Sequence, residues 1–201
     1  MGSQRSGGVF VYARGRNAER TRTDEPMNKA ERARQRLLET AKTMAAGTYC
    51  RKVVAPLFQR MIRAEHGAMD EGYYPAIRRN VIAPIYKCVG ECVCVTCGDV
   101  NAWDSGIKGM HTGHFVASRR NSILLEEDNV APQCSSCNFY QSGAPAEFRM
   151  WMEEIRGIEV IERLQDLKRE SVSFSREDLV DMRIAFRDRL KAAELKMKGM
   201  E

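Results

Sequence analysis

The spacing of hydrophobic residues predicts helices in the first third of the chain. Residues 27–46, MNKAERARQRLLETAKTMAA, are rich in strong helix formers and are followed by Gly47, a common helix stop. Residues 51–67 predict a second helix, which could start at Pro56 because proline fits a first helical turn. We therefore interpret residues 27–87 as a helical N-terminal region.

The last third has apolar residues at three- and four-residue steps, the period of an amphipathic helix. Residues 144–157 place a proline in a first turn, before the stripe Phe148, Trp151, Met152 and Ile155. Residues 158–170 continue the helical pattern. Residues 175–199 begin with a variant capping box (Ser175, Asp178) and carry the stripe Leu179, Met182, Phe186, Leu190 and Ala193. These stripes predict a helical C-terminal region over 144–201, packed against a core or a partner helix.

The middle of the chain has only short apolar runs. Residues 68–93 are expected to be irregular, since Pro75 and Pro84 interrupt them. The short runs that could form structure are two strands, HFVAS at 114–118 and SILL at 122–125, and a helix start, SSCNFYQ at 135–141. Together with the flanking helices, they predict an α+β protein that is mostly helical.

Composition indicates an ordinary soluble protein. With 201 residues, 43% of them hydrophobic and 29% charged, the chain can bury the core of one domain and carry appendages. No apolar run approaches the roughly 18 residues that span a bilayer, and the N-terminus lacks the apolar core of a signal peptide. We therefore expect a cytoplasmic protein with no membrane partner.

Positive charge is concentrated near the N-terminus. The net charge is +5, and residues 1–46 hold ten Lys/Arg against five Asp/Glu. Residues 1–26 are rich in Gly, Arg, Ser and Thr, which predicts a basic and largely disordered arm. Such an arm suits a polyanion such as DNA, because phosphate neutralisation releases counterions. The alternative is a solvated tail without a partner.

Six of the seven cysteines lie in short spacings. In a chain without an export signal, this pattern indicates metal binding rather than disulfides. Two Cys-x2-Cys pairs predict a structural zinc held by the thiolates of Cys94, Cys97, Cys134 and Cys137. Cys88 and Cys92 offer alternative ligands, but CVTCGD has the glycine that a knuckle turn needs. A zinc ion closed by four thiolates has no open position for water, so catalysis would require a second, harder cation.

Motifs between and beside the cysteine pairs carry a family resemblance. HTGHF, EEDNV and CSSCN resemble the ββα-metal nucleases of the HNH group, in which a histidine ends a strand, an asparagine follows and a third residue lies early in a helix. Asn138 at the third position resembles endonuclease VII of T-even phages. Together, CVTCG, GHF, QCSSCN, SG and FR are similar to the lambda-type phage recombination nucleases called NinG or Rap, over about Val93 to the C-terminus.

The resemblance implies a zinc-stapled, HNH-like ββα-metal core at residues 88–143, between the two helical regions. It also implies a structure-selective endonuclease that cuts branched DNA, such as Holliday junctions or D-loops, in the cytoplasm of the host cell. A junction needs symmetric nicks, so a homodimer is expected, with the long C-terminal helix as one possible contact.

Phosphodiester hydrolysis gives the motif residues distinct roles. It needs an activated water and a divalent cation that stabilises the developing charge. His114 is the candidate base, since a neutral imidazole can take the proton of water. Asn129 would fix the imidazole through its amide oxygen, or hold the loop in place. Asn138 would give its carbonyl oxygen to Mg²⁺ or Mn²⁺.

One departure from the family pattern concerns the cation ligands. HNH nucleases commonly carry an acid directly before the base, where this chain has Gly113. The lambda-type relatives place an acid three residues before the histidine, which corresponds to His111. His111 could be a nitrogen ligand instead, which would favour Mn²⁺ or Zn²⁺. Asp104 or Asp99 could supply the missing carboxylate.

DNA contacts are less localised in the sequence. The candidates for phosphate binding are Arg78, Arg79, Lys108, Arg119, Arg120 and Arg149, each of which could equally be a solvated charge. No base-reading motif is present, so recognition of DNA shape is expected. Two other functions stay open: a non-catalytic zinc-ribbon DNA-binding or adaptor protein, and an HNH nicking enzyme that acts on ordinary duplex.

Overall fold

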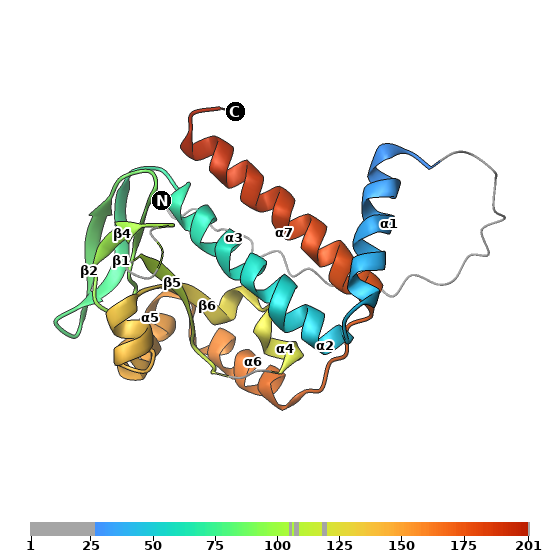
Figure 1. Ribbon diagram of the computed structural model, residues 1–201. Helices are drawn as coiled ribbons and strands as arrows, with labels where there is room; N and C mark the ends of the chain where they lie inside the picture. The colour runs from blue at the N-terminus through green and yellow to red at the C-terminus, as the bar shows by residue number, and fades with distance from the viewer. Residues whose placement is uncertain (1–26, 105, 107–108, 118–119, 201) are drawn as a thin grey trace.

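A computed structural model describes residues 27–104, 106, 109–117 and 120–200. The chain is α+β and mostly helical, as the sequence predicts (Figure 1). Its helical elements are α1 (Lys29–Lys42), α2 (Ala46–Tyr49), η1 (Cys50–Val54), α3 (Ala55–Gly67), α4 (Asn121–Leu124), η3 (Glu127–Asn129), η4 (Ser136–Tyr140), α5 (Pro145–Ile155), α6 (Ile158–Arg169) and α7 (Arg176–Met197). Its strands are β1 (Gly72–Arg78), β2 (Val81–Lys87), β3 (Glu91–Val93), β4 (Val100–Ala102), β5 (Met110–His114) and β6 (Val130–Cys134).

Helices α3 and α7 lie side by side and form the larger core together with α1 and α2 (Figure 1). The rings of Phe58 and Phe186 meet there with their centroids 5.2 Å apart. The predicted stripe of α7 points into this core, with Leu179, Phe186, Leu190 and Ala193 all buried. Since that stripe is used within the chain, a homodimer would need another surface.

Two capping boxes fix the starts of the long outer helices. At the start of α1, the side chain of Asn28 accepts a hydrogen bond from the backbone N–H of Glu31, and the side chain of Glu31 accepts one from the backbone N–H of Asn28. Ser175 and Asp178 form the same reciprocal pair of hydrogen bonds at the start of α7. Each box satisfies backbone donors that the first turn of a helix leaves unpaired. The capping box predicted for the C-terminal helix is therefore confirmed.

A π-helical turn joins α2 to α3. The helical path runs without a break from Ala46 to Gly67, and the π turn η1 ends two residues before Pro56. Proline has no N–H and its ring clashes with the preceding turn, so a widened turn lets the helix pass this point. The predicted second helix is confirmed, and α3 itself begins one residue before Pro56. None of the helices in the described residues combines the length and apolar character needed to cross a membrane.

Three antiparallel two-stranded ribbons, β1–β2, β3–β4 and β5–β6, form the second half of the fold. A smaller core joins them to α5 and α6, and its buried members are Ile77, Val95, Val116, Ile123, Ala131, Phe148, Trp151, Met152, Ile161 and Leu164. The β5–β6 ribbon lies between the two cores. Successive residues of a strand point to opposite faces. Accordingly, Val130 packs in the helical core and Ala131 in the smaller core.

The structure corrects three local predictions. The stretch expected to be irregular contains the β1–β2 hairpin and β3. Its two prolines, Pro75 and Pro84, are cross-strand partners in a two-stranded ribbon, where a strand can do without some of its N–H donors. SILL was predicted as a strand but lies in α4 and the residue after it. HFVAS contributes only His114 to a strand, and the strand that pairs with β5 is VAPQC.

Candidate functional site

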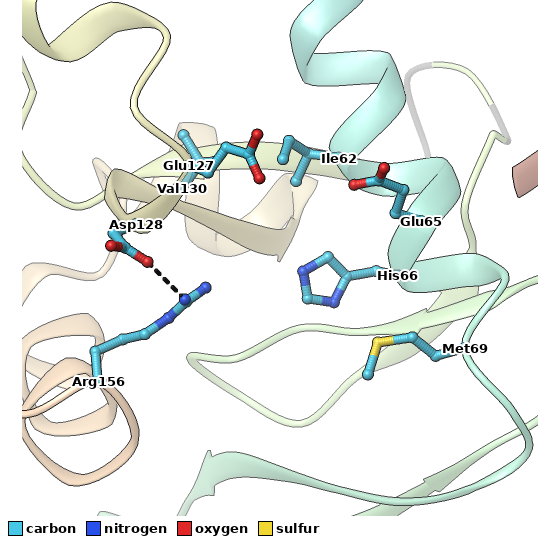
Figure 2. A pocket seen from close by; sticks show the side chains of 8 residues that line it. All are labelled: Ile62, Glu65, His66, Met69, Glu127, Asp128, Val130 and Arg156. Atoms are coloured by element: carbon cyan, nitrogen blue, oxygen red, sulfur yellow. Dashed lines mark hydrogen bonds and ion pairs between the residues drawn. The ribbon is translucent and has the colours of Figure 1, made fainter. Parts of the chain in front are cut away.

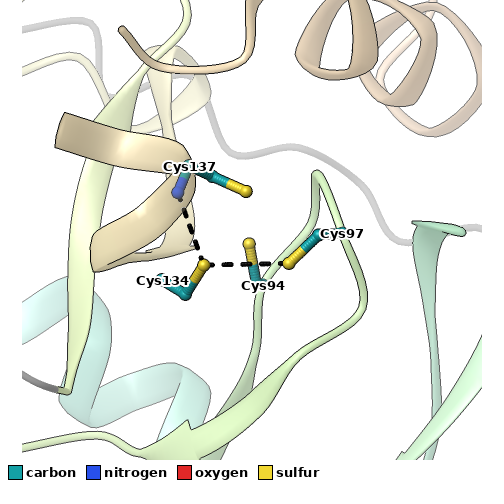
Figure 3. A group of neighbouring side chains, drawn as sticks. All are labelled: Cys94, Cys97, Cys134 and Cys137. Carbon is teal, nitrogen blue, oxygen red and sulfur yellow. Dashed lines mark hydrogen bonds between the residues drawn. The ribbon is translucent and has the colours of Figure 1, made fainter. Parts of the chain in front are cut away.

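The four cysteines of the two Cys-x2-Cys pairs come together in one cage (Figure 3). Their sulfur atoms all lie within 4.8 Å of one another. The first pair sits in a knuckle that follows β3, in which Gly98 adopts a φ of 80° and its N–H donates to the carbonyl of Cys94 at 2.9 Å. The second pair joins the end of β6 to η4, and the N–H of Cys137 donates to the sulfur of Cys134 at 3.5 Å.

The spacing of the sulfurs fits a tetrahedral metal site. Four thiolates at about 2.3 Å from a central zinc ion are about 3.8 Å apart. The sulfurs of Cys97 and Cys134 are 3.7 Å apart. Hydrogen bonds from Cys97 and Thr96 to the sulfur of Cys94 lower the pKa of this thiol, so the position favours a thiolate. The cage could therefore hold a metal ion, and its sulfur ligands suit zinc.

The other cysteines stay outside the cage. The thiol of Cys92 donates to the carbonyl of Arg63 at 3.3 Å, and burial raises its pKa to about 12. Cys88 is exposed, and Cys50 is buried in the helical core. Cys88 and Cys92, the alternative ligands that the sequence left open, are therefore not part of the cage.

Asn129 holds the loop that follows His114. It is fully buried, and its Oδ1 accepts a hydrogen bond from the N–H of Val116 at 2.7 Å. Its Nδ2 donates to the carbonyls of Val116 at 3.2 Å and Ile123 at 3.3 Å. Of the two roles considered for this residue, the hydrogen bonds correspond to the second, in which it fixes the loop rather than the imidazole.

His114 ends β5, opposite Val130. Strand alternation places its side chain on the face of Thr112, whose hydroxyl donates to the carbonyl of Gln59 in α3 at 2.8 Å. Burial lowers the pKa of His114, and the carbonyls of Leu124 and Thr112 oppose this only in part. Its Nε2 is buried and has no hydrogen-bond partner among the described residues. The imidazole is therefore neutral near pH 7, and one of its nitrogens is not used by the fold.

His111 and Asn138 lie on the other side of the ribbon. The ring of His111 meets that of Phe139 edge-on, with centroids 4.6 Å apart, which brings β5 against η4. Asn138 is half-buried in η4, directly after Cys137. Because His111 and His114 are three residues apart in a strand, they face opposite ways. The structure thus brings His111 against η4, the turn that contains Asn138, whereas the candidate base points away from His111.

A second, harder cation finds less support in the arrangement of side chains. In the part of the chain that the structure describes, the four cysteines are the one group of three or more Cys, His, Asp or Glu residues close enough to share an ion. Asp104 is paired with Arg60, at 3.3 Å, and Asp99 belongs to the knuckle. Neither carboxylate joins a histidine in such a group. No reaction step is therefore assigned to this cation.

Gln133 has a position that sequence analysis missed. It is fully buried in β6, and its Nε2 donates to the hydroxyl of Thr96 at 3.2 Å and to the carbonyl of Gly143 at 2.7 Å. It thereby ties the first knuckle and the segment after η4 to the β5–β6 ribbon. The one available signal was its place in QCSSCN, directly before a cage cysteine.

The candidate DNA contacts are dispersed. Arg120 lies at the start of α4, where its guanidinium donates to the carbonyl of Arg169 at 3.3 Å. Arg149 is exposed on α5 and paired with Glu153 at 2.8 Å. Arg78 and Arg79 are exposed at the β1–β2 turn. Lys108 and Arg119 lie outside the described residues, as does the basic arm over residues 1–26.

A pocket of about 250 Å³ lies between α3, η3 and the end of α5 (Figure 2). Its acidic side chains are held by arginines: Glu65 and Glu127 by Arg189, and Asp128 by Arg156 and Arg163. The side chain of His66, from the last turn of α3, also lines the pocket. Burial, followed by the charges of Arg156 and Lys87, lowers its pKa to about 4. This network fixes η3, whose last residue is Asn129.

Comparison with known proteins identifies a family. Residues 80–196, more than half of the chain, match the family model described as NinG, the bacteriophage lambda NinG protein. The match spans both cysteine pairs, His114, Asn129 and Asn138, and it begins at the turn of the β1–β2 hairpin. Searches of curated proteins and of solved structures returned no significant match.

Proposed function

This chain belongs to the family of the bacteriophage lambda NinG protein, and from that premise we propose that it is a metal-dependent endonuclease that cuts branched DNA during phage recombination. One observation carries the proposal. His114 ends the first strand of a ribbon, Asn129 fixes the loop beyond it, and Asn138 lies in the helical turn after the second strand. This strand, strand and helix order is the one that the resemblance to ββα-metal nucleases implies.

In the proposed reaction, a water oxygen attacks the phosphorus atom and the bond from phosphorus to the leaving 3′ oxygen breaks. His114 takes the proton of the attacking water. Its lowered pKa keeps the imidazole unprotonated near pH 7, and its unpaired Nε2 can accept the proton. Because Nε2 is out of contact with solvent in this conformation, the proposal requires that the attacking water gain access to it when DNA binds.

Asn129 acts in this proposal as a positioning residue. Its amide fixes Val116, two residues after His114, and also Ile123 in α4. The backbone on both sides of the loop is therefore tied to one buried side chain. These hydrogen bonds hold the backbone just beyond His114, which keeps the imidazole close to its place at the end of β5.

The proposal includes two kinds of metal. Zinc in the cysteine cage holds η4 and the first knuckle against the ribbon. A divalent cation such as Mg²⁺ or Mn²⁺ would stabilise the charge that gathers on the phosphate. Asn138 and His111 are its candidate ligands, through an amide oxygen and an imidazole nitrogen. The ring contact of His111 with Phe139, the residue after Asn138, supports this part of the proposal.

The proposed partner is DNA, bound through its shape and its phosphates. The net charge of +5 favours a polyanion. The described candidates for phosphate contact are Arg78, Arg79, Arg120 and Arg149, and a second copy of the chain would supply the symmetric nick at a junction. A dimer would have to form away from the buried face of α7.

A second candidate function is a non-catalytic zinc-containing DNA-binding or adaptor protein. The burial of His114 Nε2 favours it, because a base must reach the attacking water. The hydrogen bonds of Asn129 would then serve only the fold. Both functions predict zinc binding and DNA binding, so cleavage is the property that separates them.

The test compares wild type, His114→Ala and the control His66→Gln on a four-way junction and on linear duplex, each with Mg²⁺ and with Mn²⁺. The nuclease proposal expects His114→Ala to lower the cleavage rate by about a hundredfold or more, with zinc content and DNA affinity unchanged. His66→Gln should cut like wild type. Absence of cutting by wild type on every DNA would establish the adaptor reading. Equal cutting of junction and duplex would indicate a nicking enzyme for ordinary duplex.

A further inference from the structure

An aromatic pair is exposed near the base of the β1–β2 hairpin. Tyr73 and Tyr86 are cross-strand partners whose ring centroids are 5.3 Å apart. Their exposed fractions are 72% and 47%. Aromatic side chains of this size normally contribute to a core or to an interface. An exposed pair held by the register of a ribbon offers a surface on which the flat rings of a partner can stack.

The other end of the hairpin presents two arginines in a strained turn. Arg78 and Arg79 are both exposed, and the φ angles of Arg79 and Asn80 are 53° and 61°. A two-residue turn with positive φ at both central positions normally uses Asn-Gly. An arginine at the first of these positions is unfavourable, and such strain concentrates at functional sites. The conformational preference of the turn therefore does not account for an arginine at this position.

The two ends of the hairpin differ in charge. Glu71 lies beside Tyr86, whose pKa it raises. Tyr73 and Arg78 are five residues apart on β1, which is about 17 Å along a strand and places their side chains on opposite faces of the ribbon, so a DNA that meets both must wrap over the tip of the hairpin. Phosphates are attracted to the arginine end, whereas uncharged bases fit the tyrosine end.

The cysteine cage fixes the direction of the hairpin. The N–H of Ile77 donates to the carbonyl of Val95, between Cys94 and Cys97, at 2.8 Å. The indole N–H of Trp151 in α5 donates to the carbonyl of Pro75 at 3.0 Å. The hairpin stands at the edge of the molecule, at the opposite end from α1 (Figure 1). A two-stranded ribbon also has the width that the major groove of DNA admits.

We propose that the β1–β2 hairpin is a DNA-binding arm, in which Arg78 and Arg79 contact phosphates while Tyr73 and Tyr86 stack on unpaired bases at a branch. The inference rests on the proposed function for its choice of DNA as partner. It goes beyond that function by naming the surface that separates branched from paired DNA. The family match begins at residue 80, so Tyr73, Arg78 and Arg79 lie before it.

The test measures binding by fluorescence anisotropy, without added divalent cation, to a forked DNA with unpaired arms and to a fully paired duplex. The aromatic variant is Tyr73→Ala/Tyr86→Ala, with Tyr73→Phe/Tyr86→Phe as the matched control that keeps both rings. The alanine variant should lose about tenfold or more in affinity for the fork and less than twofold for the duplex. The phenylalanine variant should bind like wild type.

The charge variant is Arg78→Gln/Arg79→Asn, because asparagine tolerates the positive φ of this turn. Its control, Arg32→Gln/Arg36→Gln, removes the same charge from the exposed face of α1. The hairpin variant should weaken binding to both DNAs and lower the slope of log affinity against log salt by about two. The α1 control should change the slope by less than half as much.

Each outcome decides between the two proposals. If both hairpin variants fold, keep their zinc and bind DNA like wild type, the β1–β2 hairpin is not a DNA-binding arm. This conclusion holds even if wild type cuts branched DNA. If the variants lose binding as expected and wild type cuts no DNA, the arm stands and the nuclease proposal fails. Unchanged DNA affinity together with altered self-association of the tyrosine variant would identify a protein contact and also overturn the arm.

Discussion

Gly113 leaves room for the side chain of Gln133. A Cβ atom at position 113 would lie 2.0 Å from Oε1 of Gln133 and 2.5 Å from its Cδ, far inside van der Waals contact. Gln133 cannot easily turn away, because its Nε2 is bound to Thr96 and Gly143. Position 113, directly before the candidate base His114, therefore needs a glycine because any larger side chain would collide with Gln133. The acid that HNH nucleases commonly carry there has no space in this chain.

This packing predicts that Gly113→Ala destabilises the protein by about 1–3 kcal/mol, since overpacking a buried site displaces its neighbours. Gly47→Ala is the matched control: its Cβ would meet nothing closer than 3.5 Å, and alanine is the better helix former. That control should be neutral or slightly stabilising. Chemical denaturation of both variants gives the comparison.

The pairing with Gln133 can be tested separately. Gln133→Ala alone should also destabilise, because it leaves the carbonyl of Gly143 without its donor. In the Gln133→Ala background, however, Gly113→Ala should cost much less than in wild type. A double-mutant cycle with no coupling would show that the two residues do not compete for the same space.

The cage predicts different results for cysteines that lie close in sequence. Cys97→Ser should abolish stoichiometric zinc binding and lower the free energy of unfolding by several kcal/mol, because metal binding and folding are linked. Cys88→Ser should leave both unchanged, since Cys88 is exposed and outside the cage. Metal content by mass spectrometry and thermal unfolding measure the two effects. Loss of zinc in the Cys88 variant would contradict the assignment of ligands.

The clamp by Asn129 predicts a loss of stability even without DNA. Asn129→Ala leaves the N–H of Val116 and two carbonyls without their buried partner, which should cost about 3 kcal/mol or more. Asn129→Asp keeps an acceptor for Val116 but places a negative charge near the two carbonyls. It should therefore be at least as unstable near pH 7. If either variant were as stable as wild type, the hydrogen bonds of Asn129 would not be what holds this loop.

The parts of the fold that were predicted depend on local signals. Helices α1, α5, α6 and α7 follow from apolar periodicity, caps and prolines that lie within each segment. The cage follows from cysteine spacing, since a two-residue gap lets both thiolates meet one ion. The parts that failed depend on distant partners. SILL becomes helical where the amide of Asn129 binds the carbonyl of Ile123, and Gln133 gains its role only from Thr96 and Gly143.

The β1–β2 hairpin is another element that local sequence signals did not predict. Pro75 and Pro84 each weaken the case for a strand when taken alone. Their pairing across a ribbon, and the hydrogen bond from Trp151 to Pro75, become visible only in three dimensions. The sequence likewise placed His111 and His114 in one motif, whereas the alternation of β5 turns them to opposite faces.

The last prediction concerns His66 and the pH dependence of stability. The folded pKa of His66 is about 4, below the ordinary value of 6.5. Above pH 6.5 the residue is neutral in both the folded and the unfolded chain and has no effect. Between 6.5 and 4 the unfolded chain takes up a proton that the folded chain refuses, so stability falls as the pH falls. Between pH 7 and pH 5 the loss amounts to about 2 kcal/mol.

His66→Gln removes this titration, so the stability of wild type relative to the variant should fall by that amount from pH 7 to pH 5. The comparison stops at pH 5, above the range in which ordinary carboxylates titrate. Arg156→Gln should reduce the effect, because the charge of Arg156 is the second cause of the lowered pKa after burial. A difference between wild type and His66→Gln that stays constant over this range would mean that His66 has the same pKa in the folded and the unfolded chain. NMR titration of its ring would measure the folded pKa directly.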